Sequence, residues 1–169
     1  MNHESRTMNV ELTADEQKLV DHAKEAIRVH NTIRHEKGDI DTLFAFILTD
    51  SGKIYDGGCF EPNIAHATVC GERHAIANMV LGEGHKAKIK SIVIADPVPS
   101  VQEKGTPPCG TCRNLIWAHG TPETAVILLQ YIQHGADTGD LSWTFPKIEK
   151  FSAKDFYPHP YEPVPGLWD

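Results

Sequence analysis

The fold predicted for this chain depends on two segments, Cys70-Gly71-Glu72-Arg73 and Pro108-Cys109-Gly110-Thr111-Cys112-Arg113. Together they supply three cysteines, and three thiolates fill three of the four positions around a tetrahedral zinc ion. The fourth position is then open to water, which zinc turns into a nucleophile near neutral pH. Glu72 stands two residues from the first cysteine, close enough to move a proton of that water without being a ligand. The pattern therefore predicts a reactive zinc site.

Both cysteine segments stand where the sequence predicts the beginning of a helix. After each of them, apolar residues recur at helical spacing until glycines end the run: Ala75, Ile76, Met79 and Val80 before Gly82 and Gly84, then Leu115 and Ile116 before Gly120. The free N–H groups and positive dipole end of a helix N-terminus favour a thiolate and lower a cysteine's pKa. We therefore expect two helix N-termini to converge on one ion.

Two arginines are expected around this ion. Zn²⁺ and three thiolates sum to one negative charge, which weakens the metal as a Lewis acid unless neighbouring cations withdraw charge from the sulfurs. Arg73 and Arg113 each directly follow a residue of the site. We assign them to the surroundings of the sulfurs.

Three other interpretations of the cysteines stay open at this point. A C-x-x-C pair is also a redox motif, although that interpretation gives Cys70 and Glu72 no role. Cys59 follows two glycines in a predicted loop and is a candidate fourth ligand, which would close the site into a structural one. Disulfides are not expected, because the N-terminal residues show no signal-peptide pattern.

The length and charge of the chain limit the class of protein. Its 169 residues suffice for one domain, which we expect at 13–156, after a frayed lead at 1–12 and before a proline- and aromatic-rich strap at 157–169. The net charge is −7 and the basic residues are scattered, so a nucleic-acid polymer is not the expected partner. No apolar run is long enough to span a membrane, and we expect a cytoplasmic protein.

The hydrophobic pattern predicts strands that alternate with helices. A capping box of Thr13 and Glu16 opens a helix that runs to about His35. Strands are predicted at 43–49, 54–56, 89–95 and 125–132, the first two joined as a hairpin through a turn at 50–53. Strands separated by helices imply parallel crossovers, so we expect an α/β protein with a mixed sheet and helices on both faces.

A glutamate near the first ligand cysteine and a later P-C-x-x-C run are the signature of zinc deaminases. On these residues and the hairpin at 48–55, the chain resembles the small zinc-dependent cytidine deaminases, a family that includes the blasticidin S deaminases. The likeness covers roughly 13–156 and is strongest at 48–113. It implies a three-layer α/β/α fold with a mixed five-stranded sheet, a homo-oligomer (a tetramer or a dimer) with shared active sites, zinc on Cys70, Cys109 and Cys112, and Glu72 as proton shuttle.

Departures from the family pattern concern the substrate. The family's Asn-x-Glu segment, which holds the ribose hydroxyl, stands here as Cys59-Phe60-Glu61, and its Phe-x-Val-Gly-Ala segment, whose aromatic ring lines the base pocket, stands as Asp41-Thr42-Leu43-Phe44-Ala45. We therefore assign Glu61, Cys59, Asp41 and Phe44 to substrate contacts. By the same resemblance, Phe156 ends a short helix and reaches a binding pocket in a neighbouring subunit.

The expected reaction is release of ammonia from a free, small aminated heterocycle, with a cytidine-like nucleoside or analogue as the leading candidate. The same chemistry on a blasticidin S-type antibiotic, an aminopurine or a pterin is one alternative. A non-catalytic zinc-binding protein of the same fold is another. Glu72 argues against that last possibility, because a purely structural zinc site has no use for the carboxylate.

Overall fold

The structure is a computed structural model that describes residues 10–62 and 67–158. Most of the predicted lead (1–9) and of the predicted strap (159–169) lies outside the described residues. The elements are α1 (Ala14–Glu36), β1 (Phe44–Thr49), β2 (Ile54–Gly58), α2 (Gly71–Glu83), β3 (Ile89–Pro97), α3 (Gly110–His119), β4 (Ala125–His134), β5 (Ser142–Ser152) and α4 (Ala153–Phe156).

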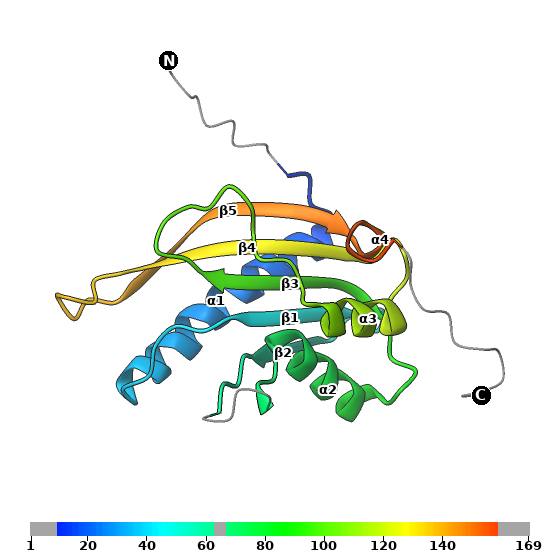
Figure 1. Cartoon of the computed structure of the whole chain (residues 1–169), viewed down its shortest axis with the longest axis horizontal. Coiled ribbons are helices and arrows are strands. Elements are labelled where there is room, and N and C mark those ends of the chain that lie inside the picture. The colour runs from blue at the N-terminus through cyan, green and yellow to red at the C-terminus, as the bar shows by residue number, and fades with distance from the viewer. Residues whose placement is uncertain (1–9, 63–66, 159–169) are drawn as a thin grey trace, which may run out of the picture.

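These elements form three layers around one mixed sheet. The five strands lie in the order β2-β1-β3-β4-β5, and only the β3–β4 pair is parallel. In Figure 1, α1 lies behind the sheet while α2 and α3 lie in front of it. The predicted α/β/α arrangement with a mixed five-stranded sheet is confirmed. None of the helices described is long and apolar enough to cross a membrane.

The first helix begins where the sequence predicts it. Thr13 and Glu16 form the capping box, in which Glu16 Oε2 accepts the Thr13 N–H at 2.7 Å. The buried side of α1 carries Leu19, Val20, Ala23 and Ile27, which pack on Phe46, Val93 and Ile127 of the sheet. This apolar cluster, which we call the rear core, fixes α1 to one face of the sheet.

A second apolar cluster, the front core, covers the opposite face. It joins Ala75, Ile76 and Met79 of α2 and Ile116 of α3 to Ala45, Ile92 and Val126 of the strands. Neighbouring strand residues alternate between the two cores, because successive side chains of a strand point to opposite faces. Both cysteine helices therefore lie on the same face of the sheet.

Glycines bring the N-terminus of α2 directly against the β1–β2 hairpin. A Cβ atom on Gly71 would lie 3.0 Å from the backbone nitrogen of Ala45 and 3.0 Å from the carbonyl oxygen of Gly57. A Cβ atom on Gly57 would overlap backbone atoms of Gly71 and Ala75. Only glycine fits at position 57, and a side chain at position 71 would push the backbones a few tenths of an ångström apart, so the first turn of α2 is held in place by backbone contact.

The last strand, β5, was not located from the sequence. It carries Pro146 and pairs with β4 alone, at the edge of the sheet. An edge strand tolerates proline, since its outward N–H groups have no ladder partner. The register pairs Gln130 with Lys147 and Leu128 with Glu149.

Candidate metal centre and active site

Three cysteine side chains meet in front of the sheet. Cys70 and Cys109 are the N-cap residues of α2 and α3, and Cys112 lies in the first turn of α3. The sulfur of Cys109 is 3.8 Å from that of Cys70 and 3.4 Å from that of Cys112. Two sulfurs on one tetrahedral zinc ion at about 2.3 Å lie about 3.8 Å apart, so the three thiols fit a zinc ion with little movement.

Cys59 lies outside this cluster. Among the residues that the structure describes, only Cys70, Cys109 and Cys112 form a group of three or more candidate ligands whose donor atoms all lie within 4.8 Å of one another. All four cysteines are free thiols. The arrangement suits a metal with three protein ligands, the number found in catalytic zinc sites.

The pKa shifts of the two capping thiols differ in direction. At Cys109, burial works to raise the pKa, but hydrogen bonds from the backbone N–H groups of Cys112 and Thr111 contribute to a net lowering. The expectation is confirmed there. It is wrong for Cys70, where burial, the Cys109 thiol and the charge of Glu72 raise the pKa. Burial and Glu72 also raise the pKa of Cys112.

Glu72 lies in the first turn of α2, directly beside the cysteines. Its side chain is buried, and its charge raises the pKa of the Cys112 and Cys70 thiols. Burial raises the pKa of its carboxyl group, against the smaller effects of backbone and Cys112 hydrogen bonds and of Arg73. Its Oε2 is buried and has no hydrogen-bond partner among the described residues. A carboxyl group with a raised pKa and a free oxygen is suited to accept and return a proton near neutral pH.

The two arginines hold the segments that precede the cysteines. Arg73 donates through Nη2 to the carbonyl oxygen of Thr68, and Arg113 donates through Nε to that of Pro108 at 2.7 Å. Both hydrogen bonds span five residues and end just before a cysteine. Among the described residues, neither arginine donates a hydrogen bond to a sulfur. Their contacts therefore fix the backbone ahead of Cys70 and Cys109.

Cys59 and Glu61 follow directly after β2 in the chain. The thiol of Cys59 donates to Oε1 of Glu61 over 3.8 Å. Burial raises the pKa of Cys59 to about 11, and the charges of Glu61, Cys70 and Glu72 act in the same direction. Phe60, between them, pairs with Val69 through a backbone bridge, so this segment lies beside the residue that precedes Cys70.

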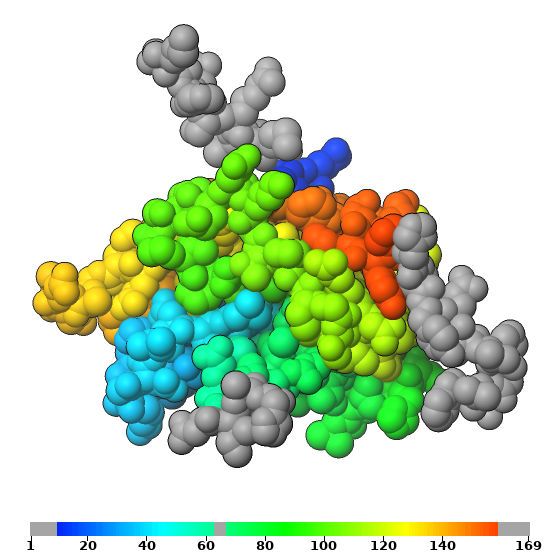
Figure 2. Space-filling model, viewed as in Figure 1, coloured from blue at the N-terminus to red at the C-terminus, as the bar shows by residue number. Residues whose placement is uncertain are grey.

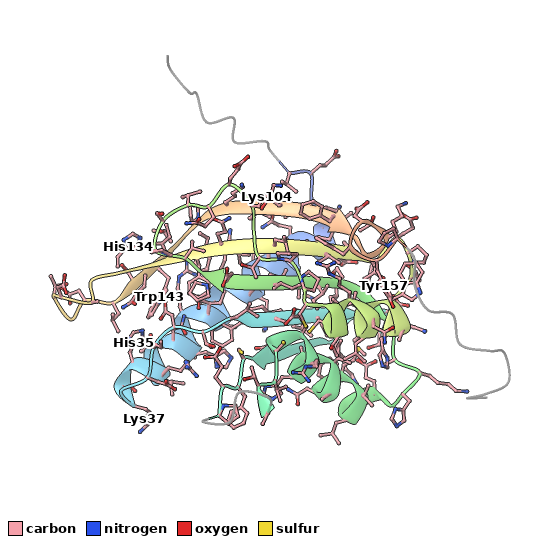
Figure 3. The ribbon with its side chains drawn as sticks, in the orientation of Figure 1. His35, Lys37, Lys104, His134, Trp143 and Tyr157 are labelled. Carbon is pink, nitrogen blue, oxygen red and sulfur yellow. The ribbon has the colours of Figure 1, made fainter. Side chains whose placement is uncertain are left out.

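Asp41 and Phe44 lie on the rear side of the sheet. Asp41 accepts hydrogen bonds from Trp143 Nε1 at 2.9 Å and from His35 Nε2 at 2.8 Å. The ring of Phe44 stacks on His30 with centroids 5.6 Å apart and belongs to the rear core. Figure 3 shows His35 and Trp143 near the C-terminal end of α1. The structure thus does not bring Asp41 or the Phe44 ring together with the cysteines.

Phe156 packs within its own chain. It ends the short helix α4, as the sequence predicts, and its ring lies 5.0 Å from that of Phe151. The guanidinium group of Arg113 lies 5.8 Å from the ring centroid of Phe156. It also donates a hydrogen bond to the backbone carbonyl oxygen of Phe156 at 3.3 Å. Arg113 therefore links α4 to the backbone in front of Cys109.

Sequence reasoning missed the residues that hold the loop leading to Cys109. This loop meets Gln130 of β4 and Glu149 of β5. The available signal was Gln130 itself, a polar residue in the otherwise apolar run Ala125–Ile132. A buried amide needs hydrogen-bond partners, and the sequence alone does not show which segment provides them.

Comparison with known proteins supports the fold. No protein-family model matches the sequence, and no curated protein matches it. Among solved structures, the cytidine deaminase from Burkholderia pseudomallei is 22% identical with a TM-score of 0.53, the match covering 81% of this chain and 98% of that one. The cytidine deaminase from Mycobacterium leprae is 14% identical with a TM-score of 0.52, the match covering 80% of this chain and 97% of that one. The chain therefore has a cytidine deaminase-like fold, with a three-cysteine cluster suited to zinc in front of its sheet.

Proposed function

We propose that the protein is a zinc-dependent hydrolytic deaminase that releases ammonia from a free, small aminated heterocycle. One observation carries the proposal: the three thiols of Cys70, Cys109 and Cys112 converge beside the buried, unpartnered carboxyl oxygen of Glu72. These thiolates would hold a zinc ion, whose chemistry would be to lower the pKa of a water molecule and so supply a nucleophile near neutral pH. The fold of the two cytidine deaminases is consistent with this chemistry.

Glu72 is the proposed proton carrier of the reaction. Its carboxylate accepts a proton from the attacking water and gives it to the ring nitrogen next to the carbon that carries the amine. It then transfers the second proton of the water to the amine, which leaves as ammonia while the ring carbon becomes a carbonyl. Each such transfer is typically worth about 10²–10⁴ in rate, and one side chain serves both.

A non-catalytic zinc protein is the competing interpretation. Burying a carboxyl oxygen without a hydrogen-bond partner, as at Oε2 of Glu72, costs folding free energy, and a structural site gains nothing in return. Structural zinc sites also have four protein ligands, whereas Cys59 stays outside the cluster. Both observations favour the enzyme.

The proposed substrate is a cytidine-like nucleoside or an analogue of one. Support comes from Glu61, which stands where the family's sugar-binding glutamate is expected and accepts a hydrogen bond from the thiol of Cys59. Blasticidin S-type antibiotics, aminopurines and pterins are the alternatives, since Cys59 replaces the asparagine of that segment. Homo-oligomer formation stays a prediction from the resemblance, and a cytoplasmic location stays a prediction from the sequence.

An ammonia-release screen tests this proposal. Zinc-loaded protein is incubated with cytidine, deoxycytidine, cytosine, blasticidin S, aminopurines and pterins, and ammonia is measured beside the hydroxylated product. We expect equal amounts of both from at least one compound. No ammonia from any compound, with one zinc ion bound per chain, would contradict the proposal and favour the non-catalytic interpretation.

A further inference from the structure

Side chains of β4 and β5 hold the backbone of residues 98–108, which we call the cysteine loop because Cys109 follows it. Gln130 of β4 donates through Nε2 to the carbonyl oxygen of Gln102 at 3.0 Å. Its Oε1 accepts the Gln102 N–H at 2.8 Å. The Gln130 residue is 1% exposed. One buried amide thus binds both backbone groups of a single loop residue, as a neighbouring strand would.

A second anchor lies three residues further along the loop. Oε2 of Glu149 accepts the Gly105 N–H at 2.6 Å, and Lys147 Nζ donates to the carbonyl oxygens of Gln102, at 3.2 Å, and Glu103. A Cβ atom on Gly105 would lie 2.8 Å from Cβ of Leu128. The loop is therefore pressed against β4 at Gly105 and held there from β5.

The strand register explains why these side chains converge. Gln130 pairs with Lys147 and Leu128 with Glu149. Gln130, Lys147 and Glu149 therefore stand on the same face of the sheet as Leu128, which belongs to the front core. In Figure 1 the loop between β3 and α3 crosses in front of β4 and β5 before it returns to α3. Figure 2 shows it (green, upper left) as a continuous cover over this part of the sheet. The loop, and not a helix, therefore packs over the polar residues of β4 and β5.

The anchored part of the loop ends close to the metal centre in the sequence. Pro108 follows Gly105 by three residues, is buried, and gives its carbonyl oxygen to Arg113. The stretch between Gly105 and Cys109 therefore has both of its ends fixed. Release of the anchors at Gln102 and Gly105 would leave only the Arg113 contact to fix the backbone ahead of Cys109.

We propose that Gln130 and Glu149, assisted by Lys147, are positioning residues that set the place of the Cys109 thiol in the three-cysteine cluster. The proposal rests on the proposed function, in which that cluster holds zinc. An apolar side chain would cover the sheet at position 130 equally well. Gln130 differs from an apolar residue because its amide hydrogen-bonds Gln102 and so fixes the position of the loop.

The test compares Gln130→Leu, which keeps the approximate size and removes both hydrogen bonds, with Lys104→Ala. Lys104 lies in the same loop, is exposed, and has no hydrogen bond or ion pair within the described part of the chain (Figure 3). The first measurement is the rate of zinc release to a chelator. The second is the absorption spectrum of the Co²⁺-substituted protein, which reports the geometry of the thiolates. For Gln130→Leu we expect release about 2- to 10-fold faster per lost hydrogen bond and shifted Co²⁺ bands, while Lys104→Ala matches the wild type.

Position 149 provides an independent pair of variants. Glu149→Gln keeps an oxygen that accepts the Gly105 N–H, whereas Glu149→Leu does not. We expect zinc release from Glu149→Gln to stay close to the wild-type rate and release from Glu149→Leu to be faster. Wild-type release rates and Co²⁺ spectra in both leucine variants would overturn the positioning role, even if those variants unfolded at lower temperature.

A measurement without metal separates this proposal from the proposed function. If the wild type binds no zinc, the proposed function fails. The rate at which iodoacetamide alkylates Cys109 in metal-free protein, followed by peptide mass spectrometry, then decides the positioning role. Faster alkylation of Cys109, relative to Cys70, in Gln130→Leu supports the role. An unchanged ratio of the two rates overturns it.

Discussion

The sulfur of Cys70 lies 3.8 Å from the sulfur of Cys109, although 39 residues separate them in the sequence. The contact exists because α2 and α3 both cover the front face of the sheet and begin near one another. Each cysteine caps its own helix, and each is preceded by a segment held by an arginine. The convergence of two helix N-termini is thus a property of the fold, and zinc needs only small adjustments to bind there.

Metal content is the first prediction. The wild type should bind about one zinc ion per chain, because the three sulfurs already lie at distances that suit a tetrahedral ion. Cys109→Ala should lose the ion, and Cys59→Ala should retain it, since Cys59 lies outside the cluster. Elemental analysis of the purified proteins measures this. Loss of zinc from Cys59→Ala would show that the centre has four protein ligands.

Zinc affinity should rise steeply with pH. Burial raises the pKa of Cys70 and Cys112, so these groups carry protons at neutral pH in the metal-free protein and release them when zinc binds. Titration calorimetry in buffers of different ionisation enthalpy counts the protons. We expect about two to three per zinc ion at pH 7. Release of fewer than one would contradict the raised pKa values.

Glu72 should destabilise the metal-free protein at high pH. Burial raises its pKa, so the folded state holds the proton more tightly than the unfolded chain does. The free energy of unfolding then falls as pH rises through that raised pKa. Glu72→Gln cannot ionise, so its stability advantage over the wild type should grow with pH. Urea unfolding with a chelator, at acidic and at alkaline pH, measures the difference. A constant difference would contradict the assigned shift.

Replacement of Asp41 should lower the stability of the fold and leave zinc binding unchanged. Asp41→Ala leaves the Nε1 group of Trp143, whose side chain is largely buried, without its acceptor. An unpaired buried donor costs about 1–3 kcal/mol. Thermal unfolding should show this loss while zinc content stays at the wild-type level. A variant that unfolds like the wild type but loses zinc would contradict this and would show that Asp41 supports the metal centre.

Specificity should depend on Cys59. Cys59 stands where the family pattern has an asparagine that holds the sugar hydroxyl. We therefore expect cytidine to be a poor substrate. One lost hydrogen bond costs about 0.5–1.5 kcal/mol, so Cys59→Asn should raise kcat/KM for cytidine by roughly 2- to 10-fold. Steady-state kinetics on both proteins test this. A wild-type kcat/KM for cytidine in the ordinary enzyme range of roughly 10⁴–10⁸ M⁻¹s⁻¹ would contradict it.

Local patterns in the sequence were sufficient for several elements. The capping box at Thr13 and Glu16 spans one helical turn, and the glycines after each cysteine helix are close to its end. The C-x-x-C spacing places Cys109 and Cys112 in one turn of a helix whatever surrounds them. Such features depend on neighbours in the sequence, and the structure confirms them.

Features that depend on distant residues were not predictable. All six residues of β1 are buried, so the hydrophobic pattern does not show which face Phe44 occupies. The partner of Asp41, Trp143, is 102 residues away. Trp143 also belongs to β5, which was not located from the sequence. For the same reason, the anchoring of the cysteine loop by Gln130 required the structure.

The most direct test of the proposed reaction compares zinc-loaded wild type and Glu72→Gln for ammonia release from the best substrate of the screen. Glutamine keeps the shape of the side chain but cannot accept a proton. Both proteins should hold about one zinc ion per chain, and the turnover of Glu72→Gln should be lower by at least about 10². Wild-type turnover in the zinc-loaded variant would contradict the proposed role of Glu72 and, with it, the proposed reaction.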